Sequence, residues 1–397
     1  MHAGALKPTL AVRGLDLDAT VASDPRLLRQ GLAGDAVTRF VDVVLPGGTY
    51  VAVPDGRIGE APSPYALKAE HGRFFVEHDN GGGRERVEVR LRRQPAFYER
   101  RTSSGLPMAR AATIHGSALV VHPAGTCGFS VHGVPCGFCV EGARGRFEAV
   151  PVADVVEVVR AAFEEGAAEL VYFNGGVYEG DDGGFEFLVP YIEAVRRHFD
   201  TLVAAQLHPP RTNVWIDRAY AIGVDAISYN LEIFDPDVLA RHCIGRTKYI
   251  RRERYLEALG YAATIFPRGT VWSDLVVGIE PVASTLAGID ALADLGVVPV
   301  AALRPRPGSP PAEDVARVLA HLYQAVHRRG IPMRWVRGLA FGVSPLEARH
   351  FAGTDARLAV AVQGLTRSRL GAMAVRGLAR TRRRLRVQVT APAGSRH

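Results

Sequence analysis

The sequence predicts an α/β fold built on a partial (β/α)6 TIM-like barrel, with a small β-rich N-terminal region and a helical, basic C-terminal extension. Three observations support this prediction. From about residue 118 to about residue 328, short β-branched runs alternate with amphipathic stretches, as βαβ units around a parallel sheet do. Six such units can be counted, and right-handed crossovers would curl them into part of a barrel. Before about residue 112, strand-like runs are separated by turn clusters.

Each predicted barrel strand is a short apolar run, and each predicted helix repeats apolar residues three and four positions apart. We expect strands at Ala118–His122, Glu169–Phe173, Leu202–Gln206, Ala226–Asn230, Val271–Gly278 and Val297–Leu303. We expect helices at Val152–Glu165, Phe187–His198, Arg252–Ile265, Val282–Leu295 and Ala312–His327. The N-terminal strands are expected at Thr38–Leu45, Thr49–Pro54, Arg73–His78 and Arg86–Leu91. The expected regions are therefore 1–112, 113–330 and 331–397.

The composition is that of an ordinary soluble globular protein. Of 397 residues, 47% are hydrophobic and 42 are glycine, which allows a sizeable core. Apolar runs such as Leu295–Leu303 stop far short of the roughly 18 residues that a membrane span needs. The N-terminus lacks the features of a signal peptide. We therefore expect a cytoplasmic protein that makes no membrane contact.

The net charge of +7 is concentrated partly in a C-terminal run of arginines between Arg380 and Arg386. Such a run could touch nucleic acid or acidic lipid. It has no interleaved aromatic residues, and no nucleic-acid-binding module is recognisable. The run is therefore interpreted as a solvated tail, and nucleic acid is not expected as a partner.

Three of the four cysteines, Cys127, Cys136 and Cys139, lie within thirteen positions directly after the first predicted barrel strand. Four cysteines in so long a chain do not form a secreted disulfide framework. Three thiolates on one loop can instead bind three corners of a [4Fe–4S] cluster and leave the fourth iron open for chemistry. Active sites of (β/α) barrels lie at this end of the strands.

Two other interpretations of the cysteines stay open. Cys136 and Cys139 could form a disulfide or a redox pair, which would not need Cys127. A zinc site could use the three cysteines with His132 or His122 as the fourth ligand. Two features favour the cluster. Phe138 stands directly before the last cysteine, and the cysteine loop is placed after the first of the six βα units.

With these residues, the chain resembles the radical S-adenosylmethionine (SAM) superfamily, and most nearly its biotin synthase and lipoyl synthase branch. The family usually has three residues between the first two cysteines, whereas eight separate Cys127 from Cys136, so the motif here is the variant C-x8-C-x2-C. The Cys-x-aromatic-Cys end is intact from Cys136 to Cys139. The resemblance implies one [4Fe–4S] cluster and SAM as cofactors.

The ends of the later strands carry further likenesses. Strand two ends in Asn174-Gly175-Gly176, where the family's glycine-rich turn accepts the SAM amine; Val177 stands in place of the family's acidic residue, and Glu179 is nearby. Strand four leads into Asn230-Leu-Glu232, similar to the Asn-Leu-Glu of biotin and lipoyl synthases. Strand alternation would send Asn230 and Glu232 to one face, and the resemblance implies contacts with the ribose and methionine of SAM.

Three further positions follow from the resemblance. The relatives carry an arginine for the SAM carboxylate in the segment after Cys243, and Arg252 and Arg254 are the candidates here. Gly278 and Ile279, at the end of strand five, resemble the residues that flank adenine in biotin synthase. Arg304 begins the corresponding end of strand six.

The resemblance implies that SAM is reductively cleaved to a 5′-deoxyadenosyl radical, which abstracts hydrogen from a small molecule in cofactor or natural-product biosynthesis. Reduced flavodoxin or ferredoxin would supply the electron. Only Cys243 remains as a further cysteine, so the auxiliary cluster of biotin-type sulfur insertion is not expected. Cys243 is interpreted as a buried cysteine, with hydrogen donation or sulfur handling as the alternative.

His208, which follows strand three, is a candidate for proton transfer, and a structural histidine is the alternative. Two other functions for the whole chain also stay open. One is radical sulfur transfer without a conventional auxiliary cluster. The other is a zinc-stabilised barrel that acts as a binding protein.

Overall fold

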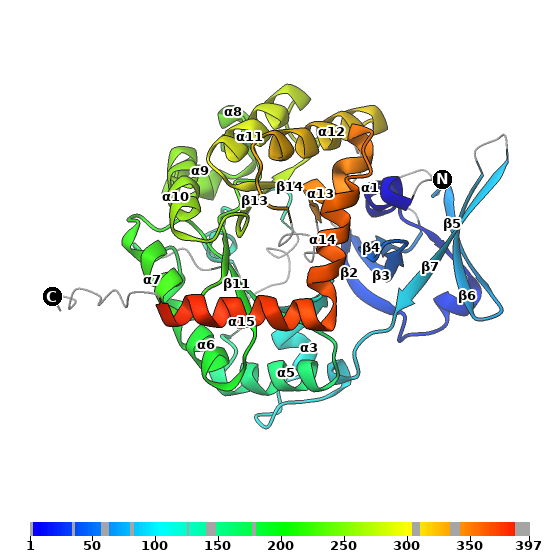
Figure 1. The fold of residues 1–397 in the computed structure, drawn as a ribbon. Helices are drawn as coiled ribbons and strands as arrows, with labels where there is room; N and C mark the ends of the chain where they lie inside the picture. The colour runs from blue at the N-terminus through cyan, green and yellow to red at the C-terminus, as the bar shows by residue number, and fades with distance from the viewer. Residues whose placement is uncertain are drawn as a thin grey trace.

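The computed structural model describes residues 3–33, 36–56, 63–79, 83–124, 127–139, 148–176, 180–303, 310–333 and 342–385. These residues form a mixed α/β fold with two large hydrophobic cores and one smaller apolar cluster. Figure 1 shows the helices of the larger part arranged around its strands, with the N-terminal strands to one side. Arg304 and Glu179, named from the sequence, lie outside the described residues.

The N-terminal region forms a sheet in the order β1-β5-β6-β7-β3-β2, with β4 paired to β3. Its strands are β1 (Asp16–Leu17), β2 (Leu28–Ala33), β3 (Ala36–Leu45), β4 (Thr49–Pro54), β5 (Tyr65–Glu70), β6 (Arg73–Asp79) and β7 (Arg84–Arg92). The helices α1 (Ala3–Arg13) and α2 (Ala19–Ala22) belong to the same region, whereas the 3₁₀ helix Ala96–Glu99 packs into the larger core through Phe97. Leu6 and Leu10 of α1 are buried in the core of this sheet.

The larger part contains a sheet in the order β15-β14-β13-β12-β11-β10-β9-β8. Its strands are β8 (Ala112–His115), β9 (Ala118–Val121), β10 (Leu170–Asn174), β11 (Leu202–Gln206), β12 (Ala226–Ser228), β13 (Val271–Val276), β14 (Val298–Ala302) and β15 (Gly342–Val343). The strands from β9 to β14 are parallel, whereas β8 and β15 pair antiparallel at the two edges. Strands therefore occur at all six ranges expected from the sequence, and the two short edge strands were not expected.

The connections between the parallel strands are helical. They contain α4 (Gly128–Val131), α5 (Val152–Glu164), α6 (Phe185–His198), α7 (Val214–Ile222), α8 (Pro236–His242), α9 (Ile244–Tyr249), α10 (Arg252–Ile265) and α11 (Val282–Asp294). The described chain also contains the 3₁₀ helix Arg349–Ala352 and the helices α3 (Met108–Ala111), α12 (Ala312–Arg328), α13 (Pro345–Ala348), α14 (Arg357–Arg367) and α15 (Arg369–Leu385). Among the described residues, no helix is long and apolar enough to cross a membrane.

The C-terminal region is not only an extension, because two of its elements pack into the rest of the molecule. β15 joins the sheet of the larger part, and Glu347 of α13 makes an ion pair with Lys7 of α1. Both charged side chains are buried, and the Lys7 Nζ atom lies 3.0 and 3.1 Å from the two carboxylate oxygens. Glu347 also accepts hydrogen bonds from the backbone N–H and the hydroxyl of Ser344.

Replacing Lys7 with Met is expected to lower the free energy of unfolding by about 3 kcal/mol, because it leaves the Glu347 carboxylate buried without its cation. Adding Glu347→Gln to the Lys7→Met variant should restore part of the lost free energy of unfolding. Arg357→Met, at the exposed Arg357–Asp355 pair, is the control and should change stability by less than about 0.5 kcal/mol. Urea unfolding followed by circular dichroism measures all three. Equal effects of the Lys7 and Arg357 substitutions would contradict a structural role for the buried pair.

Candidate active site

The cysteine loop follows β9 and lies against the glycine turn that follows β10. Cys127 occupies the N-cap position of α4. The next residue, Gly128, donates its backbone N–H to the carbonyl of Gly176 at 2.9 Å. On the other side of this turn, Gly175 donates to the carbonyl of Gln206 at 2.9 Å. The predicted cysteine loop and the predicted SAM-amine turn are therefore direct neighbours.

Phe129, two residues after Cys127, fixes the loop in place. Its buried ring meets His208 edge-on, with 4.8 Å between ring centroids, and stacks with Tyr249 at 6.5 Å. A Cβ atom on Gly245 would lie 2.6 Å from the Phe129 ring and 2.9 Å from the carbonyl of Val134. Only glycine at position 245 allows α9 to approach the loop so closely.

Cys136 and Cys243, far apart in sequence, lie together in a small apolar cluster. The cluster contains Cys136, Ile233, Val238, Leu239 and Cys243, with Phe138, Cys139 and Ile279 packed against it. The backbone N–H of Gly137 donates to the carbonyl of His242 at 2.8 Å, which joins the cysteine loop to the end of α8. The cluster brings the fourth cysteine to the loop that carries the other three.

A hydrogen bond joins the two buried thiols. The Cys243 thiol donates to the Cys136 sulfur, which lowers the pKa of Cys136 and raises that of Cys243. The Arg246 guanidinium further favours a Cys136 thiolate, and the thiolate is the form that binds metals. Cys127, by contrast, has its pKa raised by burial. None of the four cysteines forms a disulfide bond.

A zinc site and a [4Fe–4S] cluster require different spacings between their ligands. Among the described residues, no three His, Cys, Asp or Glu side chains are gathered tightly enough to hold a metal ion. Zinc needs such a set, because all its ligands bind one ion at about 2.0–2.3 Å. In a [4Fe–4S] cluster each thiolate binds a different iron, so the sulfurs stand farther apart. The described part of the chain therefore holds no preformed ligand set for a single metal ion. The three thiols on one loop match a [4Fe–4S] cluster in type and number.

Beside the cysteines lies a buried ion pair between Arg246 of α9 and Glu232. The closest nitrogen and oxygen are 3.6 Å apart, and less than a tenth of each side chain is exposed. Burial opposes the charge of Arg246, but the nearby acidic groups outweigh it and raise its pKa. Arg246 also donates to the carbonyl of Asn230, and its guanidinium lies 5.6 Å from the centre of the Tyr255 ring.

Each member of this pair keeps a buried polar atom without a hydrogen-bond partner among the described residues. These atoms are Oε2 of Glu232 and Nε of Arg246. Glu232 also has a φ of 70°, an uncommon conformation for a residue with a side chain. Unsatisfied buried atoms and local strain together mark functional sites. A ligand with a cationic and an anionic group would satisfy both atoms.

Asn230 is held in a polar network between β12 and β13. Its Oδ1 accepts from the Ser228 hydroxyl at 2.5 Å, and its Nδ2 donates to Asp274 Oδ2 at 3.2 Å. β12 ends at Ser228, so the strand alternation expected to align Asn230 with Glu232 does not extend to them. They are instead brought together by Arg246, which contacts both.

The structure does not place Arg252 and Arg254, the two candidates for the SAM carboxylate, beside the cysteines. Arg252 donates to the carbonyl of Phe234 at 2.7 Å and packs on its ring, with the guanidinium 4.2 Å from the ring centre. Arg254 donates to the carbonyl of Pro210 at 2.6 Å and to Asn213 at 2.7 Å. The arginine that contacts both Glu232 and Asn230 is Arg246, and its burial, which the sequence did not reveal, distinguishes it from Arg252 and Arg254.

Gly278 and Ile279 lie at the end of β13. Gly278 has a φ of 86°, and a Cβ atom there would lie 2.7 Å from Pro310. Ile279 packs against the apolar cluster of Cys136 and Cys243. The next residue, Glu280, is buried and accepts the backbone N–H groups of Phe234 and Asp235 at 2.9 and 2.7 Å. Glu280 thereby fixes the segment that carries Glu232.

His208 is buried beside Tyr255 and Phe129. Its Nδ1 lies 3.2 Å from the Tyr255 hydroxyl, and the ring packs on Phe129. Burial, reinforced by Arg246, lowers the pKa of His208 to about 3. The imidazole is therefore neutral at physiological pH and supports the cysteine loop through Phe129. These contacts favour the structural alternative named from the sequence.

The low pKa of His208 predicts a pH dependence of stability. In the unfolded chain the histidine pKa is about 6.5, so protons bind the unfolded state preferentially between about pH 6.5 and pH 3. The contribution of neutral His208 to the free energy of unfolding is complete above pH 6.5. It falls by about 2 kcal/mol as the pH is lowered from 6.5 to 5. We expect His208→Gln to flatten this slope, measured by urea unfolding at both pH values. His198→Gln, at an exposed histidine of α6, is the control, and equal slopes in all three proteins would contradict the assignment.

Comparison with known proteins gives partial matches. No protein-family model matches the chain. A bacteriochlorophyllide c C-7(1)-hydroxylase of Chlorobaculum limnaeum is 30% identical over 110 residues, which is 27% of each chain. The chain thus matches about a quarter of the length of this curated relative.

Solved structures give weaker likenesses. The hydrogenase maturase HydG of Carboxydothermus hydrogenoformans superposes with a TM-score of 0.43 and 16% identity, over 54% of this chain and 53% of the other. Streptococcus suis SuiB bound to S-adenosylmethionine superposes with a TM-score of 0.42 and 14% identity, over 56% of this chain and 50% of the other.

Proposed function

We propose that this protein is a radical SAM enzyme that cleaves SAM reductively at one [4Fe–4S] cluster and removes hydrogen from a small-molecule substrate. One observation carries the proposal. A buried Arg246–Glu232 pair with two unsatisfied polar atoms lies beside a loop with three cysteines at the carboxyl end of a parallel sheet. SAM carries an amine and a carboxylate, the two groups that this pair can bind.

In this proposal Cys127, Cys136 and Cys139 hold the cluster. The reduced cluster, when bound, supplies the electron that splits the C5′–S bond of SAM into methionine and a 5′-deoxyadenosyl radical. The chain's own residues bind and orient SAM. Arg246 is poised to bind the carboxylate, because a guanidinium presents paired donors to both oxygens. The Glu232 carboxylate can accept the SAM amine or a ribose hydroxyl.

The glycine turn contributes by its shape. A Cβ atom on Gly175 would lie 3.0 Å from Leu207 and 3.2 Å from the Gln206 carbonyl, so a side chain would push the turn away. The Gly176 carbonyl already accepts from the N–H of Gly128 and thus ties the SAM-amine turn to the cysteine loop. Gly278 and Ile279 would face adenine, and the partial (β/α)6 barrel would surround the reacting atoms.

Substrate contacts are proposed for the polar side chains of β10, β11 and β13. The Tyr172 hydroxyl donates to Gln206, and its ring lies 6.0 Å from that of Trp272. Burial raises the pKa of Tyr172, and the charges of Asp274 and Glu232 raise it further, so the phenol remains protonated. This cluster offers the amide of Gln206 and the carboxylate of Asp274 next to the proposed SAM site.

The chemistry of the substrate step is the finer part of the proposal. Because Cys243 is buried and its thiol donates a hydrogen bond to the Cys136 sulfur, it is poorly placed to hand sulfur to a substrate. Hydrogen removal from carbon is therefore preferred over sulfur transfer. The name of the curated relative, a bacteriochlorophyllide c C-7(1)-hydroxylase, describes a reaction at carbon and supports this preference. Reduced flavodoxin or ferredoxin is the proposed electron donor.

A turnover assay tests this function. The protein, reconstituted anaerobically with iron and sulfide, is incubated with SAM and dithionite, and products are quantified by liquid chromatography with mass spectrometry. We expect 5′-deoxyadenosine and methionine in equal amounts, and neither product after the cluster is removed with a chelator. A protein that contains a complete cluster and SAM yet forms no 5′-deoxyadenosine would contradict the proposal.

A further inference from the structure

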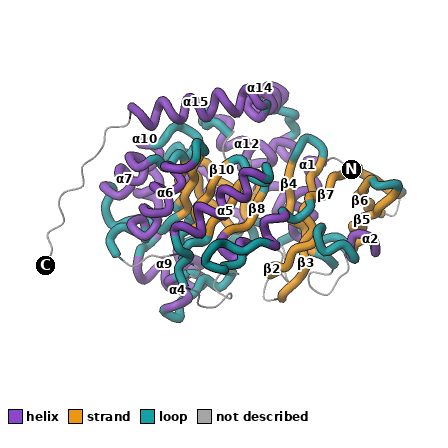
Figure 2. The backbone as a smooth tube through the Cα atoms, turned by 90° about the horizontal axis from the view of Figure 1, so that it is seen from below, coloured by secondary structure: helices purple, strands orange, loops and turns teal. Residues whose placement is uncertain are grey.

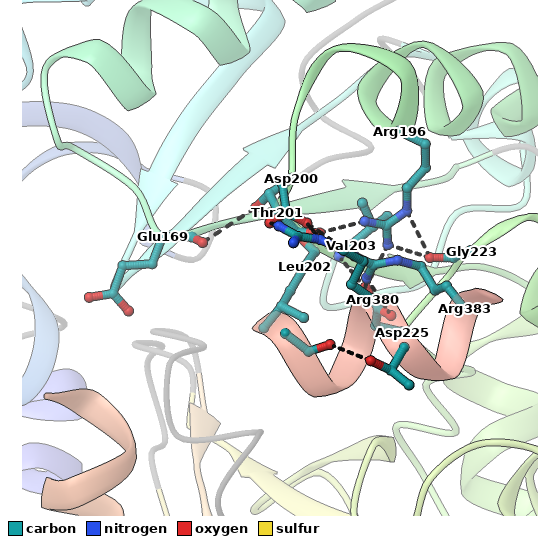
Figure 3. Close-up of polar contacts among 12 residues, drawn as sticks. Glu169, Arg196, Asp200, Thr201, Leu202, Val203, Gly223, Asp225, Arg380 and Arg383 are labelled. Atoms are coloured by element: carbon teal, nitrogen blue, oxygen red, sulfur yellow. Dashed lines mark hydrogen bonds and ion pairs between the residues drawn. The ribbon is translucent and has the colours of Figure 1, made fainter. Parts of the chain in front are cut away.

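The C-terminal helices α14 and α15 lie along one edge of the molecule, as Figure 2 shows. α15 is attached through its charged side. Arg380 makes an ion pair with Asp200, and Arg383 lies 3.4 Å from Asp200 and 3.0 Å from Asp225. Figure 3 shows both arginines reaching from the helix to these two aspartates.

This attachment fixes which face of α15 points outward. Asp225 is buried and is also paired with Arg196 at 2.5 Å, so it is a rigid anchor inside the protein. The Arg383 side chain is only 14% exposed, and Ala379 on the same side of the helix is buried. The side of α15 opposite Ala379, Arg380 and Arg383 is consequently held toward solvent.

That outward side is apolar. Large hydrophobic side chains on the two helices are between 55% and 80% exposed, namely Leu358, Leu365, Leu370, Met373, Leu378 and Leu385. An amphipathic helix of a soluble protein normally turns its apolar face to the core. Here the ion pairs hold the polar side inward, and no described residues cover the apolar side. An exposed apolar patch of this kind indicates an interaction surface.

The charge of the helices identifies the partner. Between Arg357 and Leu385 there are eight arginines and no Asp or Glu. Arg382 and Arg384 are exposed and flank the apolar side of α15 on the helical wheel. A second copy of the chain would bring the exposed arginines of the two copies together with no acidic residue on these helices to pair with them, and nucleic acid would leave the leucines in water. An anionic bilayer covers leucines with acyl chains and arginines with head groups.

We propose that α14 and α15 dock on the surface of an anionic lipid membrane. The helices lie in the plane of the interface, with Leu370, Leu378 and Leu385 among the acyl chains and Arg382 and Arg384 at the phosphates. The contact is peripheral, since no described helix can span the bilayer. This inference revises the solvated tail expected from the sequence, and it does not depend on the proposed enzyme activity.

Vesicle flotation with the full-length protein tests the inference. The probes are vesicles of phosphatidylcholine alone and of phosphatidylcholine with about 30% phosphatidylglycerol, at low and high salt. We expect binding to the anionic vesicles only, weakened by salt. The double variant Leu370→Gln/Leu378→Gln should bind at least about tenfold more weakly, because each leucine loses favourable apolar burial. Arg382→Gln/Arg384→Gln should also bind at least about tenfold more weakly.

Two controls make the outcome decisive. Val214→Gln removes an exposed apolar residue from α7, outside the proposed surface, and should bind as the wild type does. Unchanged thermal unfolding of all variants shows that the fold is retained. Equal binding to neutral and anionic vesicles, or wild-type binding by the double leucine variant, would overturn the inference. A wild-type dimer that the leucine substitutions convert to monomer would overturn it too, because a second copy would then cover the face.

Discussion

Replacing Arg246 with Lys is expected to weaken SAM binding by about ten- to a hundredfold while the protein stays folded. Lysine keeps a positive charge beside Glu232, so the carboxylate is not left unpaired, but it lacks the planar pair of donors that holds a carboxylate at two points. A lost hydrogen bond to a charged group costs about 1.5–3 kcal/mol, which sets this range. Isothermal titration of anaerobically reconstituted protein with SAM measures the change.

Arg252→Lys and Arg254→Lys are the matched controls for this experiment. Both residues follow Arg246 closely in sequence, but they donate to the carbonyls of Phe234 and Pro210 rather than to the site. Their variants should bind SAM as the wild type does. A loss of affinity at either control that equals the loss at Arg246 would mean that the effect comes from disturbing α9 and α10 and not from a lost SAM contact.

Replacing Cys136 with Ser is expected to remove most of the bound iron, whereas Cys243→Ala should keep about four irons per chain. The two thiols are hydrogen-bonded neighbours in one apolar cluster. Comparing the two variants therefore distinguishes a cluster ligand from a residue that only supports the ligand. Loss of the Cys243 thiol leaves a small cavity and should lower stability by about 1–2 kcal/mol. Iron and sulfide analysis of reconstituted protein gives the first result and urea unfolding the second.

The reverse result is equally informative. If Cys243→Ala loses its iron and Cys136→Ser retains it, the cluster is bound by a different set of thiolates from the one proposed. The variants Cys127→Ser and Cys139→Ser complete the comparison, and both should behave like Cys136→Ser.

The periodicity of the sequence was sufficient to locate the larger sheet. β9 to β14 are apolar runs separated by helices with a buried side, and this pattern needs no knowledge of tertiary contacts. The edge strands β8 and β15 are too short to show a period. Helix α1 was missed because Pro8 interrupts its pattern and its burial depends on the N-terminal sheet.

The candidate site was predictable in its motifs but not in its contacts. The three cysteines and the glycine turn could be located along the chain, because each follows a predicted strand directly. Arg246 could not be singled out, since α9 and α10 are separated by Arg251, whose φ of 72° breaks the helical register. The supporting role of His208 depends on Phe129, which approaches from a different loop.

The proposed cluster is tested most directly by electron paramagnetic resonance of the reduced, reconstituted protein with and without SAM. We expect the signal of one [4Fe–4S] cluster per chain, altered by SAM, because an open iron would bind the amine and carboxylate of the added ligand. Protein purified with one zinc and no iron, or an iron–sulfur signal that SAM leaves unchanged, would contradict this account.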